Sequence, residues 1–455
     1  MADLPASGSA KRTTLAEDVR ALIASPRDLW LVYLATLFEF LGVYATLPTL
    51  PLWLTSDFGM SDQRAGWWTG AFSTVLTIFV FVVGSIADAI GVRTTLLLSL
   101  ALAAAARLAM ALAPAEGPAI AALLSFGLAY AMSKPVLQTA VQRASDERTR
   151  AFAFSLWYVS FNVSAALSGP FVIDVCRRAF LDHATGQLVR RAVRLPILGE
   201  RMMTANGAIM GTGVVFAALA FVVVLALRKD FEHRTRPGGA AAEKRASPLA
   251  VLRDVLGDRA FWRFMVLLFF LAIVRMTFQH MYLTWPKYIV REQGESFPVG
   301  AVWSLNSVLI LVLAPLGTVL TRDRAPFQVV LLGALISAVS PFILCFGSTM
   351  PLQIAMAIVL TVGEALWSPR LYEYNVAIAP RGREATYVSL AALPQFLSTL
   401  LVGPASGYLL ATFCPASGPR HAQIMWALIG ASTLIGPLGI WLGRDWLTSP
   451  PPDRR

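Results

Sequence analysis

Long apolar stretches, separated by short polar loops, are the feature that most limits how this chain folds. The first runs from Trp30 to Leu54. A helix of about 25 residues rises about 1.5 Å per residue and crosses a hydrocarbon core of roughly 30 Å. The stretches are continuous, so they lack the alternation of polar and apolar residues that membrane β-barrel strands show. The sequence therefore predicts an all-α polytopic membrane protein.

Composition and spacing divide the chain into two halves. Of its 455 residues 56% are hydrophobic and 14% are charged, whereas soluble domains carry about 25% charged residues. Twelve transmembrane helices are predicted, at 30–54, 65–88, 94–113, 118–140, 150–174, 204–227, 260–286, 299–321, 326–347, 351–372, 384–412 and 422–443. The predicted domains are an N-terminal segment (1–29), a six-helix bundle (30–227), a flexible linker (228–259), a second six-helix bundle (260–443) and a tail (444–455).

Lys and Arg concentrate in the N-terminal segment, the linker and the tail. Basic loops stay in the cytoplasm, so both termini are predicted there, in a cell membrane or, in a Gram-negative cell, the inner membrane. The net charge of +11 is explained in this way and predicts no nucleic-acid partner. One outer loop is an exception, since residues 175–203 carry six Arg. Its stretch 186–194 is expected to form a hairpin or a surface helix. The loop is either a solvated lid or a binding surface for an anionic substrate or lipid headgroup.

Five ionisable side chains lie well inside predicted spans: Glu39, Arg107, Lys134, Arg275 and Glu364. A charge at the centre of a membrane helix costs about 2.5–3.5 kcal/mol on insertion scales, so each is a candidate functional residue. The alternative is a fixed ion pair that only locks two helices together. Arg107 is nearest a helix end, where it is expected to snorkel toward the surface.

The seventh span carries a polar face. Arg275, Gln279 and His280 lie one turn apart and share one side of a helix. His280 is either a titrating group in the transport path or a hydrogen-bonded packing residue. The four histidines form no ligand cluster, so no metal site and no cofactor is predicted.

Two six-helix halves joined by a cytoplasmic linker resemble the major facilitator superfamily, whose halves rock around a site at the membrane midplane. The loop between the second and third spans is similar to that superfamily's G-x-x-x-D-x-x-G-x-R motif, with Gly84, Asp88, Gly91 and Arg93 in place. The resemblance implies close helix packing at Gly84, a carboxylate at Asp88 that accepts from helix N-termini, and a turn at Gly91. A plain polar turn capped by Asp88 is the alternative.

Four further motifs look like those of the proton-dependent oligopeptide transporter family. They are Glu39 with Tyr44 in the first span, Lys134-Pro135 in the fourth, Trp157-Tyr158 with Phe161-Asn162 in the fifth, and Gly363-Glu364 with Ser368-Pro369 in the tenth. The resemblance implies that Glu39, Lys134 and Glu364 couple protons to transport, and that the first two contact a substrate carboxylate and Glu364 a substrate amino group. It places Tyr44 and Asn162 on the cavity wall.

The first span departs from this family at two positions. Thr36 stands where the family has its first Glu, and Phe40 where it has Arg. The missing guanidinium removes a bidentate donor for a carboxylate. Arg275 is the candidate that supplies this positive charge from the other half. Gln279, His280 and Trp367 complete the predicted substrate-binding residues.

The predicted function is alternating-access transport, namely proton-coupled symport of a small zwitterionic or anionic solute by a monomer in the lipid bilayer. The alternatives are a proton antiporter that exports amphipathic drugs and a sensor that does not transport. An exporter would use an aromatic cavity, for which Trp67, Trp68, Phe278, Trp303 and Trp367 are the candidates. An enzyme is not expected, because the sequence holds no Gly-x-Ser-x-Gly, no His-Glu-x-x-His and no phosphate-binding glycine loop.

Overall fold

The computed structural model describes residues 25–145, 149–196, 198–228, 259–378 and 393–447. Most of the predicted N-terminal segment, linker and tail, and the predicted start of the eleventh span, lie outside these ranges. Within them the chain is helical apart from short loops and two small hairpins. The predicted all-α membrane fold is confirmed.

The N-terminal half forms six spans. The first is α2 (Arg27–Thr46), which continues through η1 (Leu47–Thr49), α3 (Leu50–Leu52) and η2 (Trp53–Asp57). The others are α4 (Asp62–Ile90), α5 (Val92–Ala111), α6 (Glu116–Ala144), α7 (Arg150–Ser168) with η3 (Gly169–Ile173) and α8 (Asp174–Phe180), and α9 (Ala205–Leu225). The first span changes its helix type at Pro48 and Pro51, because proline has no N–H to continue the α-helical ladder.

The C-terminal half also forms six spans. Its spans are α11 (Arg259–Leu283) with α12 (Trp285–Gln293), α13 (Val299–Leu320), α14 (Pro326–Val339) with η5 (Ser340–Phe346), α15 (Met350–Ile378), α17 (Leu393–Phe413) and α18 (Ala422–Leu442), followed by α19 (Arg444–Leu447). Ten helical stretches in the described ranges are long and apolar enough to cross a membrane. With α4 and the apolar part of α17, they make the expected twelve.

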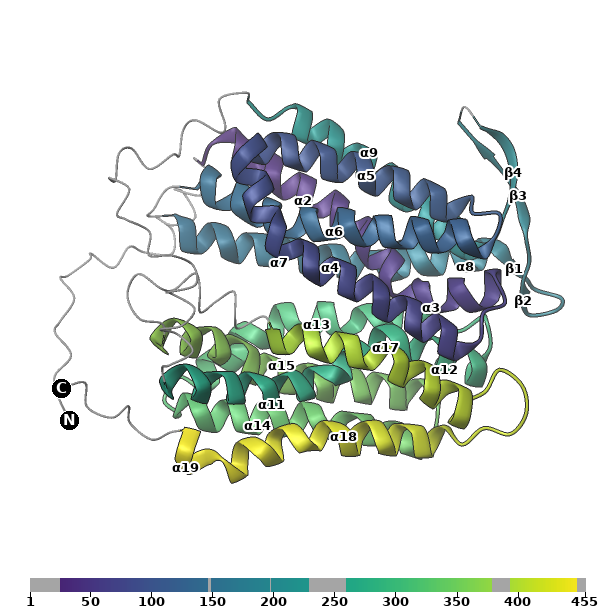
Figure 1. The fold of residues 1–455 in the computed structure, drawn as a ribbon. Coiled ribbons are helices and arrows are strands. Elements are labelled where there is room, and N and C mark those ends of the chain that lie inside the picture. The colour runs from purple at the N-terminus through teal and green to yellow at the C-terminus, as the bar shows by residue number, and fades with distance from the viewer. Residues whose placement is uncertain (1–24, 146–148, 197, 229–258, 379–392, 448–455) are drawn as a thin grey trace.

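The two halves form two bundles that lie side by side (Figure 1). One end of the molecule, which we call the hairpin end, carries the loops 58–61 and 294–298, the short helix α12 and two antiparallel hairpins. The hairpins pair β1 (Leu181–Asp182) with β2 (Gln187–Leu188), and β3 (Arg191–Leu195) with β4 (Gly199–Met203). The stretch 186–194, expected to form a hairpin or a surface helix, thus supplies strands to two different hairpins, each paired with a strand outside the stretch.

At the hairpin end the two halves touch backbone to backbone. A Cβ atom added to Gly66 of α4 would lie 2.5 Å from the carbonyl oxygen of Gly403 on α17. A Cβ atom on Gly169 would overlap the carbonyl of Gly300 at the start of α13. Small residues allow helices to approach this closely inside a membrane. The halves are therefore closed against each other at this end.

The loop between α4 and α5 agrees with its motif only in part. Gly91 ends α4 with φ +91°, a conformation that glycine adopts without strain. Arg93 donates to the carbonyl of Leu225 at 3.0 Å. The expected close packing at Gly84 is not seen among the described residues, because a Cβ atom there would meet no described atom within 4 Å. The side chain of Asp88 lies outside the described part of the structure.

Candidate substrate-binding site

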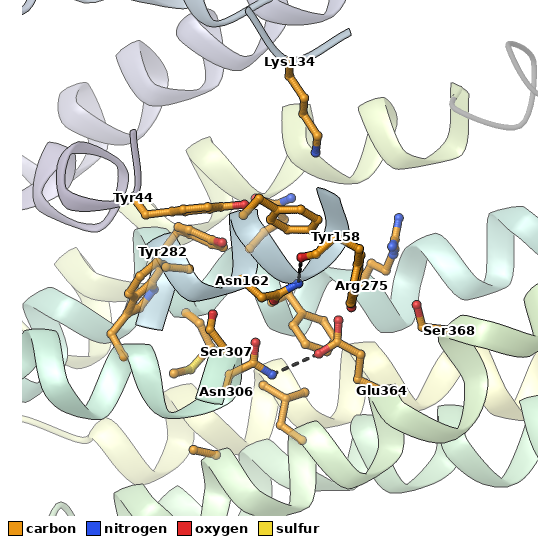
Figure 2. Close-up of a pocket in the computed structure, with 18 residues that line it drawn as sticks. Tyr44, Lys134, Tyr158, Asn162, Arg275, Tyr282, Asn306, Ser307, Glu364 and Ser368 are labelled. Atoms are coloured by element: carbon orange, nitrogen blue, oxygen red, sulfur yellow. Dashed lines mark hydrogen bonds between the residues drawn. The ribbon is translucent and has the colours of Figure 1, made fainter. Parts of the chain in front are cut away.

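A cavity of about 270 Å³ lies between the two halves. Figure 2 shows its lining residues, which come from α2, α6 and α7 of one half and from α11, α13 and α15 of the other. The predicted site residues that reach its wall are Tyr44, Lys134, Asn162, Arg275, Gln279 and Glu364. Sites at the interface of two repeats are where transporters of this architecture bind their substrates.

Three charged side chains are among the described residues of this wall. Lys134 projects from the N-terminal half, whereas Arg275 and Glu364 belong to the C-terminal half (Figure 2). The charge of Arg275 acts on both others, attracting Glu364 and repelling Lys134. Two cations against one carboxylate leave the wall with one excess positive charge, which favours a ligand that brings a negative charge.

Each charge is held by neighbours. Glu364 accepts a hydrogen bond of 2.9 Å from the amide of Asn306. The guanidinium of Arg275 lies over the ring of Trp367, 5.2 Å from its centroid. Such cation–π contacts orient a cation without neutralising it. The wall therefore presents oriented charges that still act on a ligand.

Aromatic side chains form one side of the cavity. The ring centroid of Tyr44 lies 6.4 Å from that of Phe161 and 6.0 Å from that of Trp303. Tyr282 contacts Trp303 edge-on at 5.3 Å. Flat rings beside a few oriented charges are typical of sites that bind small organic molecules.

Glu39 does not line this cavity, and its partner is not Lys134. Its carboxylate is fully buried inside the N-terminal half and accepts two hydrogen bonds, of 3.0 and 3.1 Å, from the guanidinium of Arg107. Arg107 is itself fully buried and lies over Phe126, so the expectation that it snorkels is wrong as well. Glu39, which was expected to contact a substrate carboxylate, is therefore paired with Arg107 instead.

Two glycines explain why Arg107 fits beside Glu39. A Cβ atom on Gly213 of α9 would lie 2.8 Å from Cδ of Arg107, and one on Gly42 would lie 3.3 Å from its Cζ. Both positions thus leave room for the guanidinium. The sequence contains these three residues, one Arg and two Gly, in three separate apolar spans. Their positions along the chain do not show that they meet in the fold.

His280 and Trp367 also lie away from the cavity wall. Nδ1 of His280 is 2.7 Å from the hydroxyl of Thr284, which in turn donates to Ser406 at 2.8 Å. Trp367 is fully buried and donates to Ser337 at 3.2 Å. The prediction that they contact substrate is wrong for this conformation. His280 is a hydrogen-bonded packing residue, and Trp367 supports Arg275 from behind.

Sequence reasoning left five polar wall residues out of the predicted site, namely Tyr158, Tyr282, Asn306, Ser307 and Ser368, although Tyr158 and Ser368 belong to the quoted motifs. Tyr282 follows Arg275 by seven positions and Gln279 by three, so helical periodicity alone placed it on the polar face of α11. Asn306 is an amide inside an otherwise apolar span, which is itself a signal for a site.

The hairpin end closes the cavity with ionic contacts between the halves. Asp62 accepts from Lys287 at 3.0 Å and from Arg291 at 2.8 and 3.0 Å. These groups lie outside the predicted spans. Burial alone would raise the pKa of Asp62, but hydrogen bonds and charge from Arg291 and Lys287 outweigh it and lower that pKa. Burial lowers the pKa of Lys287 to about 8, although Asp62 acts to raise it.

A second set of contacts reinforces this closure. Both carboxylate oxygens of Asp174 accept from the backbone amides of Gly300 and Ala301, at 2.7 and 2.8 Å. Asp174 therefore caps α13 of the other half. Arg177 donates to Glu295 at 2.6 Å. The hairpin end is thus sealed by an ion cluster, a helix cap and glycine contacts.

Two helical bundles that close at one end over a charged interfacial cavity define a secondary membrane transporter, not an enzyme. The family model described as Major Facilitator Superfamily matches residues 32–403, and the chain belongs to this superfamily. The "Uncharacterized MFS-type transporter YqjV" of Bacillus subtilis (strain 168) is 19% identical over 412 residues, which are 90% of this chain and 91% of that protein.

Solved structures of POT family transporters share the fold. One, in complex with 5-aminolevulinic acid, is 15% identical, with a TM-score of 0.72 over 93% of this chain and 97% of that chain. Tetrameric PepTSo2 is 16% identical, with a TM-score of 0.69 over 92% of this chain and 99% of that chain. The expected resemblance to a divergent member of this group is confirmed at the level of the fold.

Proposed function

We propose that this transporter is a proton-coupled symporter of a small zwitterionic or anionic solute. The observation that carries the proposal is the charge set of the cavity, with Lys134 on one half facing Arg275 and Glu364 on the other. A solute with a negative group bridges the two halves electrostatically. It therefore stabilises the conformations in which the halves come together around it.

Each charge then has a role. The guanidinium of Arg275 offers parallel N–H donors that suit a carboxylate, and Lys134 attracts the same group from the opposite half. A substrate ammonium group donates a hydrogen bond to the carboxyl oxygen of Glu364, beside the amide of Asn306, and this oxygen still accepts when Glu364 is protonated. Tyr44, Asn162 and Gln279 complete the polar contacts of the wall.

The proton binds at Glu364 in this proposal, because Glu364 is the carboxylate among the described wall residues. When Glu364 takes up a proton, its attraction for Arg275 is lost and Arg275 becomes available to the substrate anion. Loss of that proton restores the pair and releases the anion. Glu39, which the sequence favoured for this role, is proposed instead as a fixed structural anion held by Arg107.

The direction of access follows from the closed hairpin end. We place the protein in the cell membrane with both termini in the cytoplasm, so this conformation has the cavity closed toward the outside. Opening it to the outside separates Asp62 from Lys287 and Arg291. A monomer remains the predicted functional unit, and the tetrameric structure with the same fold makes a tetramer the alternative to test.

Two further observations support a charged solute over an apolar drug. The ligand named for the similar POT transporter, 5-aminolevulinic acid, carries a carboxylate and an amine. Of the five aromatic residues expected for an exporter cavity, Phe278 and Trp303 line the cavity as described, whereas Trp67 is 66% exposed on the outer surface.

The test is uptake into proteoliposomes with an imposed pH gradient. The probes are 5-aminolevulinic acid and a set of dipeptides. Accumulation above the equilibrium level with acid outside, abolished by a protonophore, is the expected result. Accumulation with acid inside, or efflux against the solute gradient with acid outside, would show antiport. Binding without any counterflow exchange would show a sensor, and either outcome would overturn the proposal.

A further inference from the structure

A second lobe of the cavity extends from the charged one. Its volume is about 460 Å³, and its described lining comes mainly from α4, α6 and α11. Four side chains line both lobes: Tyr44, Lys134, Gln279 and Tyr282. The two lobes are therefore adjacent, and these four side chains, Lys134 among them, form their boundary.

The second lobe exposes more apolar than polar surface, although the phenols of Tyr44, Tyr130 and Tyr282 and the amides of Gln138 and Gln279 also lie on its wall. Its wall includes Leu47, Leu50, Phe72, Leu76, Val80 and Leu283. Three hydroxyls on the wall donate to carbonyls of their own helix: Thr69 at 3.0 Å, Ser73 at 3.0 Å and Thr77 at 2.8 Å. These donors are already used, so the hydroxyls do not call for a polar ligand. Lys134 is the charged residue on the described wall, and it is shared with the first lobe.

We infer that the substrate is amphipathic, with a small zwitterionic or anionic head in the charged lobe and an apolar tail in this second lobe. The inference rests on the proposed function, whose charged lobe binds the head. A tail that extends past Lys134 and Tyr282 moves out of water and contacts an apolar wall. Each buried methylene strengthens binding by up to about fourfold. A charged solute without a tail would leave the second lobe filled with water and bind more weakly.

The test measures equilibrium binding to the protein in nanodiscs for two matched series. The first comprises alanine, 2-aminopentanoic acid and 2-aminooctanoic acid. The second comprises the alanyl dipeptides of the same three residues. Head charges are constant within each series and only the tail grows. The expected result is at least tenfold tighter binding of the longest member than of the shortest, after subtraction of partitioning into empty nanodiscs.

Two substitutions on α4 locate the tail. Leu76→Trp fills the second lobe, whereas Ile78→Trp adds the same side chain two residues later at a position that is 57% exposed on the outer surface. Leu76→Trp is expected to remove the gain from the tail and to leave the shortest member within about twofold of wild type. Ile78→Trp is expected to keep the gain. Val80→Phe is a second lobe-filling variant if Leu76→Trp does not fold.

Three outcomes separate this inference from the proposed function. Equal affinity across both series, or an equal loss for short and long members in both lobe variants, would overturn the inference and leave proton-driven uptake intact. Tail-dependent binding without proton-driven uptake would overturn the symport proposal and keep the inference. If no member of either series binds, both are wrong.

Discussion

Glu39 and Glu364 are alike in the sequence and opposite in the structure. Each is a carboxylate in the middle of an apolar span. Glu39 is sealed inside the N-terminal half by two hydrogen bonds from Arg107. Glu364 lies on the wall of the cavity between the halves, where its charge acts on Arg275 and its carboxylate accepts from Asn306.

The difference lies in whether the interacting charges belong to the same half of the protein or to opposite halves. Glu39 and Arg107 are both in the N-terminal half, so rocking of the halves does not change their distance. Lys134 is in that half, whereas Arg275 and Glu364 are in the other, so their electrostatic energy changes with conformation. A group can drive a conformational equilibrium only if its free energy differs between the two states. The interaction of Lys134 with Arg275 and Glu364 across the cavity meets this condition, whereas the Glu39–Arg107 pair within one half does not.

The largest expected effect is on Glu364. Glu364→Gln keeps an oxygen that accepts from Asn306 but cannot exchange a proton. Proton-driven accumulation in proteoliposomes is expected to fall at least a hundredfold, while substrate exchange without a gradient continues. If accumulation persists within threefold of wild type, the coupled proton is bound at another residue. Glu364 would then have no more part in proton coupling than is proposed for Glu39.

Breaking the Glu39–Arg107 pair is expected to lower the free energy of unfolding and to leave proton coupling unchanged. Arg107→Met leaves Glu39 buried and unpaired, which costs about 3–5 kcal/mol for such a group. The double variant Glu39→Met/Arg107→Met removes both charges and is expected to recover most of that loss. Unfolding in detergent, followed by circular dichroism, gives the stabilities.

Transport by the double variant is the decisive control for this pair. Its proton-driven uptake per folded molecule is expected within about threefold of wild type. A double variant that folds but no longer couples uptake to the pH gradient would show that Glu39 takes part in proton transfer.

A smaller loss of stability is expected when the space around Arg107 is filled. A Cβ atom at position 213 would lie 2.8 Å from Cδ of Arg107, so Gly213→Ala forces the side chain to shift, at a cost of about 1–3 kcal/mol. Gly211→Ala is the matched control on the same helix, because its Cβ atom would meet Met203 at an ordinary 3.7 Å. Equal melting temperatures of the two variants would show that Arg107 is not tightly held.

The smallest effect is a pH dependence of the hairpin end. With Lys287 buried, its pKa is about 8, below the ordinary value of 10.5. Between these two values the closed end binds fewer protons than an open end with Lys287 in water. Raising the pH from 7 to 9.5 therefore favours closure, and below pH 7 the contribution of Lys287 is constant.

Spin labels at Gln63 and Gln293, on opposite sides of the hairpin end, report this equilibrium by their distance distribution. The ratio of closed to open molecules is expected to rise severalfold between pH 7 and pH 9.5 in wild type and to stay unchanged in Lys287→Met. The same shift in both proteins would assign the pH dependence to another group.

The fold was predictable because it depends on patterns that are local in the sequence. Twelve apolar stretches of sufficient length predict twelve helices in lipid, where a backbone must satisfy its own hydrogen bonds. Helical periodicity on the seventh span placed Gln279 beside Arg275, and both line the cavity. The same rule extended by one turn would have found Tyr282.

The sequence by itself thus determined the helices, their division into two halves and the presence of five costly charges inside them. The tertiary structure decided which charges meet. Arg107 reaches Glu39 because glycines at positions 42 and 213, on two other helices, leave space for a guanidinium. That depends on how three helices pack, which no spacing along one helix encodes. Packing also turned His280 and Trp367 away from the cavity and left Glu364 on its wall.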